Sequence, residues 1–139
     1  MKAFFLSLCL LFISSAALAE QKQQLGPWDV HYILMPTTML DAEIARQYQL
    51  NRSRNYQLLN ISVLTKANQQ PQQVDISGTA VNLAGQRQTL TFRPIKETNA
   101  LYYLAGVEVR SDQKMTIEVT IRQGDISQTL KFSQDVYPE

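Results

Sequence analysis

The chain has 139 residues, with 13 Lys and Arg against 12 Asp and Glu and a single histidine, which gives a formal net charge of +1. Nucleic acids and anionic membrane surfaces attract strongly basic proteins, so a nearly neutral chain is not expected to bind either of them. The length is that of one ordinary domain, which can bury enough surface to fold without disulfides.

The first 19 residues have the three parts of a secretory signal peptide. Lys2 is the charged part, an apolar run extends from Ala3 to Ile13, and the small-residue triplet ends at Ala19, after which we expect cleavage. The apolar run is shorter than the roughly 20 residues that span a bilayer, so no stable membrane insertion is expected after cleavage. The only cysteine, Cys9, lies in this segment. The expected mature protein is therefore cysteine-free, periplasmic and neutral, with 12 basic and 12 acidic residues once Lys2 is removed.

The mature chain is expected to begin with a flexible leader over residues 20–26, because this segment is polar and has no apolar period. A single domain over residues 27–139 follows. Apolar residues alternate with the others from Trp28 to Met35, which predicts a strand that Pro36 ends. Residues 38–41 resemble a capping box, and Ile44 and Tyr48 are four apart, so a short helix is predicted near residues 41–47.

The rest of the chain reads as strands separated by turn signals. Tyr56–Thr65 is predicted to be a second strand that is covered on both faces, and Gly78 inside the next strand suggests a bulge. The remaining predicted strands are Val74–Leu83 and Gln86–Ile95, which form a hairpin around Ala84 and Gly85, then Leu101–Val109, Met115–Arg122 and a last strand from Ile126 to Val136. The prediction is an all-β protein, an antiparallel immunoglobulin-like β-sandwich of about seven strands with one short helical insertion after the first strand. A closed barrel would use the same strands and stays open as an alternative.

No set of residues predicts a catalytic centre, a metal site or a cofactor. One histidine and no cysteine in the mature chain are too few for zinc, and the acidic residues are too dispersed for a calcium loop. The five glycines are isolated, so there is no phosphate-binding loop.

The polar residues around the helical insertion are the candidates for a binding surface. Arg52 and Arg54, with Ser53 between them, could hold a carboxylate or a phosphate. The strand that contains His31 and Tyr32 and the segment with these arginines flank the same insertion. From chain order we hypothesise that all five residues converge on one patch. His31 could also act as a general base oriented by Asp29, two residues away, which leaves a small hydrolase as an alternative.

The chain resembles an uncharacterised exported bacterial family, "domain of unknown function 4426", over nearly all of its mature length. The residues that carry the resemblance are Gly26, Val30-His31-Tyr32, Leu40, Tyr48, Arg52-Ser53, Asn60-Ile61-Ser62-Val63, Gly78, Asn82-Leu83, Gly85-Gln86, Phe92, Ile95, Glu97, Tyr102-Tyr103 and Phe132-Ser133-Gln134. The family pattern often has Asn and Ser-Thr after the His-Tyr pair, whereas this chain has Ile33–Thr38, which puts a polar role of this segment in doubt. The resemblance implies a periplasmic β domain of unknown activity.

On these grounds the chain is expected to be a non-enzymatic periplasmic module of the cell envelope that interacts with a protein or a peptide. Two alternatives remain open. One is the small periplasmic hydrolase that uses His31. The other is an accessory factor of a cell-wall enzyme or transporter.

Overall fold

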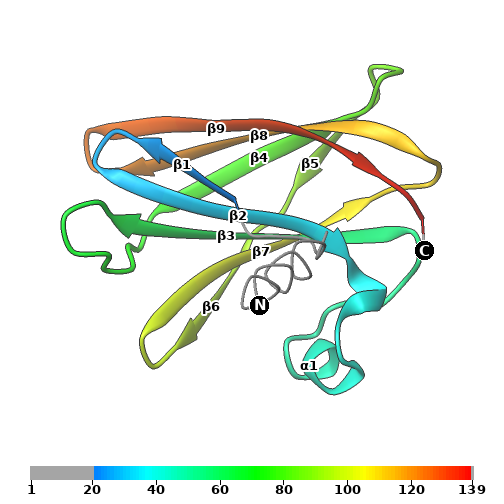
Figure 1. The fold of residues 1–139 in the computed structure, drawn as a ribbon, viewed down its shortest axis with the longest axis horizontal. Coiled ribbons are helices and arrows are strands. Elements are labelled where there is room, and N and C mark those ends of the chain that lie inside the picture. The colour runs from blue at the N-terminus through cyan, green and yellow to red at the C-terminus, as the bar shows by residue number, and fades with distance from the viewer. Residues whose placement is uncertain (1–20, 139) are drawn as a thin grey trace, which may run out of the picture.

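A computed structural model describes residues 21–138 as two antiparallel β-sheets that pack face to face (Figure 1). The predicted signal peptide and its predicted cleavage site lie outside the described residues. The first sheet has the strand order β1-β2-β3-β7-β6 and the second has the order β5-β4-β8-β9. The strands are β1 (Gln21–Leu25), β2 (Trp28–Pro36), β3 (Tyr56–Thr65), β4 (Asp75–Val81), β5 (Arg87–Leu90), β6 (Arg93–Glu97), β7 (Ala100–Glu108), β8 (Gln113–Gln123) and β9 (Ile126–Val136). The predicted antiparallel sandwich is confirmed.

Strict alternation places one face of each long strand in the space between the sheets. In β8, Met115, Ile117, Val119 and Ile121 are all buried, while the residues between them point outward. They meet a matching row from the first sheet that includes Trp28, Val30, Leu59 and Ile61. Burial of these side chains is the main stabilising contribution to the fold.

The segment expected to be a flexible leader is instead the edge strand β1. It pairs antiparallel with β2 in a register that runs from Gln21 opposite Tyr32 to Leu25 opposite Trp28. Gly26 has φ +60°, which suits the first central position of a two-residue hairpin loop. The segment has no apolar period because as an edge strand it is covered only in part, and Leu25 alone packs against the core.

The described residues 21–138 form nine strands rather than about seven, since the expected leader is a strand and the stretch 86–95 is divided in two. β5 pairs with β4 in the second sheet, whereas β6 pairs with β7 in the first. The bulge expected at Gly78 is absent, because β4 keeps continuous register with both neighbours, with Gly78 opposite Leu90 and Val119.

The helical insertion lies between β2 and β3, as expected. It consists of a 3-10 turn, Thr37–Met39, and the helix α1, Ala42–Gln47. Asp41 caps the helix, and its side chain accepts a hydrogen bond from the Glu43 backbone N–H at 2.7 Å. The predicted capping box therefore begins too early, because Thr38 belongs to the 3-10 turn. Figure 1 shows α1 beside β2 and β3 on the side of the first sheet that faces away from β8 and β9.

Candidate functional site

The outer face of the first sheet carries many hydrophobic residues. The strands β2 and β3 place Ile33, Met35, Leu58 and Leu64 on this face, because their neighbours in sequence point into the core. The second sheet does not cover them. Instead, the insertion covers one end of the face and the loop of residues 66–73 borders the other end, which leaves two hollows that share Tyr102.

The first hollow lies between the insertion and the sheet, and we call it the α1 groove. It has a volume of about 160 Å³. Its lining is mostly aliphatic and aromatic, and Glu97 is the one charged residue in it. The lining residues are Leu40, Ile44, Tyr48, Leu50, Leu58, Asn60, Ile95, Glu97, Tyr102 and Leu104.

Two polar groups in the α1 groove determine what it can bind. The Tyr48 hydroxyl donates a hydrogen bond to the Glu97 carboxylate, which ties the insertion to β6. This hydrogen bond is the largest cause that raises the pKa of Tyr48 above 10.0, followed by desolvation and by the negative charge of Glu97. Within residues 21–138, Asn60 Oδ1 is buried and accepts no hydrogen bond. The Glu97 carboxylate and Asn60 Oδ1 are both hydrogen-bond acceptors toward a ligand, so the groove offers an apolar wall with acceptor oxygens.

The second hollow, which we call the His31 hollow, has a volume of about 250 Å³ and is more polar. His31 on β2 lies directly opposite Ser62 on β3, and both line the hollow. Asp29 lies on the same face of β2 and is buried. Its Oδ2 accepts a hydrogen bond from Gln69 Nε2 at 2.8 Å and lies 3.9 Å from the Lys22 ammonium group. This carboxylate therefore holds the 66–73 loop and β1 against β2.

The structure does not bring the five predicted patch residues together. Tyr32 points to the opposite face from His31 and packs in the core, with its ring centroid 4.4 Å from that of Phe132. Arg52 and Ser53 lie beyond the far end of β2, where Pro36 pairs with Gln57. His31 is five residues back along that strand, or roughly 16 Å at the usual rise of a strand.

Arg52 and Ser53 hold the insertion in place. Arg52 Nη2 donates to the Thr38 carbonyl at 3.1 Å, and the Ser53 backbone N–H donates to Thr37 Oγ1 at 2.9 Å. Arg54 is exposed. Of the five predicted residues, only His31 lines a hollow of the outer face.

Sequence reasoning missed the residues of the α1 groove, although one signal for it was present. Leu58 and Leu64 alternate with core residues and therefore belong to a second apolar face of β3. A strand that is apolar on both faces needs a second cover. The cover proved to be the insertion, and Ile44 and Tyr48 are the residues whose spacing predicted its helix.

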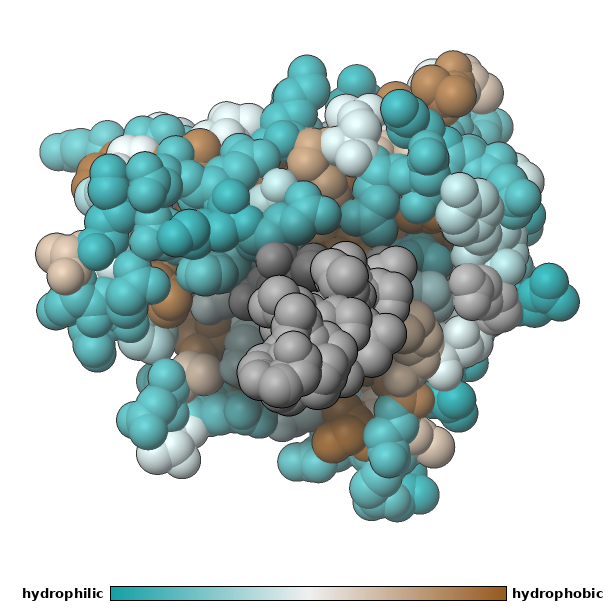
Figure 2. All heavy atoms as spheres, in the orientation of Figure 1, coloured by the Kyte–Doolittle hydropathy of each residue, from teal (hydrophilic) through white to brown (hydrophobic). Residues whose placement is uncertain are grey.

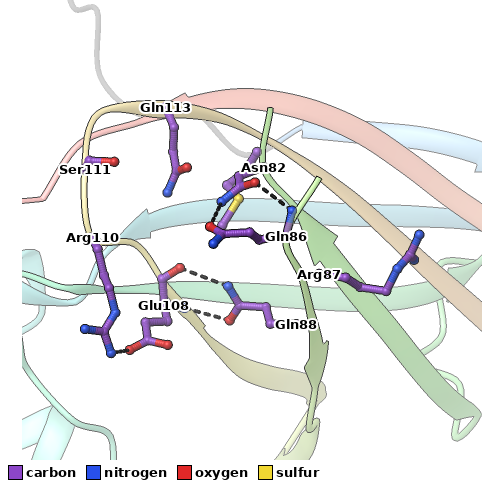
Figure 3. Close-up of a pocket in the computed structure, with 9 residues that line it drawn as sticks. Asn82, Gln86, Arg87, Gln88, Glu108, Arg110, Ser111 and Gln113 are labelled. Atoms are coloured by element: carbon purple, nitrogen blue, oxygen red, sulfur yellow. Dashed lines mark hydrogen bonds and ion pairs between the residues drawn. The ribbon is translucent and has the colours of Figure 1, made fainter. Parts of the chain in front are cut away.

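A third hollow of about 310 Å³ lies at one end of the sandwich and is polar (Figure 3). Its side chains largely bind one another. Gln88 Nε2 donates to the Glu108 carbonyl at 3.0 Å and its Oε1 accepts from the Glu108 N–H at 2.9 Å, so this side chain occupies the edge of β7 as a strand would. Asn82 pairs with Gln86 and Arg110 with Glu108. With these groups already paired, the third hollow is a weaker candidate than the outer face.

The described part of the chain shows no metal centre and no spanning helix. Within residues 21–138, no three or more His, Cys, Asp and Glu side chains are grouped so that they could hold a metal ion. No helix in that range is long and apolar enough to cross a membrane.

Comparison with known proteins supports the assignment to one family. The model of the family DUF4426, a domain of unknown function, matches residues 22–139. No curated protein matches the chain. The crystal structure of a DUF4426 family protein from Pseudomonas aeruginosa PAO1 is 27% identical, with a TM-score of 0.76, and the match covers 86% of this chain and 96% of that chain.

More distant solved structures share the fold. FetP from uropathogenic Escherichia coli strain F11, recombinantly expressed in the periplasm, is 12% identical with a TM-score of 0.60, and the match covers 86% of this chain and 94% of that one. A copper-bound variant of this FetP is 14% identical with a TM-score of 0.57, covering 86% and 95% of the two chains. The match to the family model extends over the whole described fold, so the chain belongs to the family DUF4426.

Proposed function

We propose that the protein is a non-enzymatic binding module of the bacterial cell envelope that takes a segment of another protein on the outer face of its first sheet. The observation that carries this proposal is the α1 groove, in which the insertion leaves an open, mostly apolar hollow on the face of the first sheet that the second sheet does not cover. Exposed apolar surface around a hollow is typical of interaction sites. Figure 2 shows hydrophobic residues at the lower margin of the molecule, close to the place where Figure 1 draws α1.

The proposed compartment is the periplasm. The signal-peptide pattern of residues 1–19 supports it. If the proposal is right, the protein in a periplasmic extract has the intact mass of residues 20–139. A mass that includes residues 1–19 would contradict cleavage after Ala19.

Site-specific photo-crosslinking in living cells tests the proposed surface. A photoreactive amino acid is placed at Ile44, which lines the α1 groove, or at Asn99, which lines the His31 hollow, and at Glu118 or Lys131 on the second sheet as matched exposed controls. We expect specific protein adducts from the first pair only. Adducts that form equally well from Glu118 and Lys131 would contradict the proposal. The identity of the adducts also decides whether the module is an accessory factor of a cell-wall enzyme or transporter.

A hydrolase is the second candidate, because the register places a hydroxyl, Ser62, directly opposite His31. A fluorophosphonate probe that labels activated serines distinguishes the two functions. A hydrolase would give a covalent adduct on Ser62 that disappears in His31→Gln. The binding module gives no adduct on Ser62, and Ser133 on the second sheet serves as the control serine.

Copper binding is not proposed. Copper sites in proteins use histidine, cysteine and methionine ligands, and the chain has a single histidine. The similarity to the copper-bound FetP variant, at 14% identity, concerns the fold.

A further inference from the structure

We propose that the α1 groove binds one large hydrophobic side chain of the partner segment, with a lysine or arginine next to that side chain in the partner's sequence. This inference rests on the proposed function and names the chemistry of its partner.

The size of the groove sets the size of the group that it takes. A buried apolar cavity of about 150 Å³ holds a molecule of benzene. The α1 groove has about 160 Å³, so it has room for one aromatic or large aliphatic side chain.

The walls of the groove favour such a group. Leu40, Leu50 and Ile95 are half-buried within it, and Ile44 at its rim is 42% exposed. Met39 on the same insertion is 59% exposed. An inserted side chain removes these apolar surfaces from water together with its own, and buried anchors of this kind supply most of the affinity in protein interfaces.

The polar atoms specify what lies next to the hydrophobic anchor. Asn60 Oδ1 is buried without a hydrogen-bond donor among the described residues, so it can accept one from a backbone N–H of the bound segment. Glu97 is exposed and is the one charged residue of the lining. The nearby Arg93 guanidinium is bound to the Tyr48 carbonyl. A negative group at the rim favours a basic residue in the partner and opposes an acidic one.

Selection from a random peptide library displayed on phage tests the proposal, with the exported protein as bait. We expect the selected peptides to share an aromatic or large aliphatic residue with Lys or Arg beside it. Ile44→Asp should weaken a selected peptide by at least ~10-fold, because it places a carboxylate at the mouth of the groove. The control Leu83→Asp changes another exposed aliphatic residue, 79% exposed in the β4–β5 turn, and should alter binding by less than ~2-fold.

A second variant keeps the proposal testable if Ile44→Asp does not fold. Glu97→Gln removes the charge and keeps an oxygen that accepts from the Tyr48 hydroxyl. Selection on this variant should lose the basic residue and retain the hydrophobic one. The proposal would be overturned if the selected peptides were acidic or lacked a hydrophobic anchor. It would also be overturned if Ile44→Asp and Leu83→Asp weakened binding equally. If no peptide with the expected pattern is selected while the crosslinks still form from the first pair of positions, the proposed anchor chemistry is wrong and the proposed binding function stands.

Discussion

Gly78 lies where β4 packs closely against β8, its neighbour in the second sheet, and against the Phe92 ring. A Cβ at this position would lie 2.9 Å from the Glu118 carbonyl oxygen and 3.3 Å from the Phe92 ring. The oxygen belongs to the backbone of β8 and cannot move without disturbing the sheet. We expect Gly78→Ala to lower the free energy of unfolding by about 1–3 kcal/mol in urea denaturation.

Gly106 is the matched control for this substitution. A Cβ there would meet only the Tyr56 ring, at 3.8 Å. Gly106→Ala should therefore leave the free energy of unfolding unchanged or raise it by about 0.4–1 kcal/mol, since alanine restricts the unfolded chain. Equal losses for the two variants would mean that steric contact at Gly78 is not what matters.

Thr37 joins the insertion to the start of β3. Its buried hydroxyl lies 2.8 Å from the Ser53 carbonyl and 2.9 Å from the Tyr56 carbonyl, and it accepts the Ser53 N–H at 2.9 Å. Thr37→Val removes these hydrogen bonds and leaves the Ser53 N–H without its acceptor, so we expect a loss of about 1–3 kcal/mol in the free energy of unfolding.

Two further variants separate the hydroxyl of Thr37 from other effects. Thr37→Ser keeps the hydroxyl and should be clearly less destabilising than Thr37→Val. Ser53→Ala should also be mild, because Thr37 binds the backbone of Ser53 and not its side chain. If Ser53→Ala proves as destabilising as Thr37→Val, the hydroxyl of Thr37 is not the essential link.

Tyr48 provides a test of the contact between the insertion and β6. Its pKa is raised, mainly by the hydrogen bond to Glu97, which means that folding favours the neutral phenol. The stabilisation is thus present at neutral pH and is lost as the pH rises through the raised pKa. Titration of the tyrosine Cζ signals by NMR should show that Glu97→Gln lowers the pKa of Tyr48. An unchanged pKa would show that the two side chains are apart in solution.

At the scale of the elements, β1 is the strand that takes the place of the expected leader. It is an edge strand that pairs with β2, and Gln23 Nε2 reaches across to the Lys131 carbonyl of β9 at 3.2 Å. In an antiparallel edge strand every second N–H points to the neighbour. Hydrogen exchange should therefore be slowed at alternate residues of 21–25. Uniformly fast exchange in this segment would indicate a flexible leader after all.

The strands that sequence patterns predict well are those in which burial alone decides the period. β8 is such a strand, since Met115, Ile117, Val119 and Ile121 all face the core. β1 could not be predicted in this way, because backbone groups make its pairing with β2 and its side chains show no alternation of apolar and polar residues. The division between β5 and β6 at Thr91 and Phe92 also depends on tertiary structure, as no glycine or proline lies between the two strands.

The candidate site was harder to predict than the strands, because chain order does not give distance. His31 and Arg52 flank the same insertion in sequence, yet the long strands β2 and β3 keep them far apart. Tyr32 follows His31 directly and for that reason faces the other way. Of the polar residues singled out from the sequence, Arg52 and Ser53 support the insertion, while the groove is built mostly from hydrophobic residues.

At the scale of the whole molecule, the two outer faces of the sandwich differ. The second sheet presents Glu118 and Lys131, whose charged groups lie 4.0 Å apart, and the Thr116 and Ser133 hydroxyls, which bond at 2.9 Å. Such a face is well hydrated. The first sheet instead presents leucines, isoleucines and the insertion that covers them in part. This asymmetry is the reason for placing the binding surface on the first sheet.

The whole fold should unfold as one unit, because both sheets share a single core. Trp28 is 1% exposed and lies in that core, so its fluorescence reports the contact between the sheets, while far-UV circular dichroism reports the strands themselves. For residues 20–139 we expect the two signals to follow the same urea transition, with a spectrum dominated by strand. Dithiothreitol should not move the midpoint, since Cys9 is the only cysteine. A fluorescence transition at lower urea than the dichroism transition would mean that the sheets separate before they unfold, and that the core does not act as one unit.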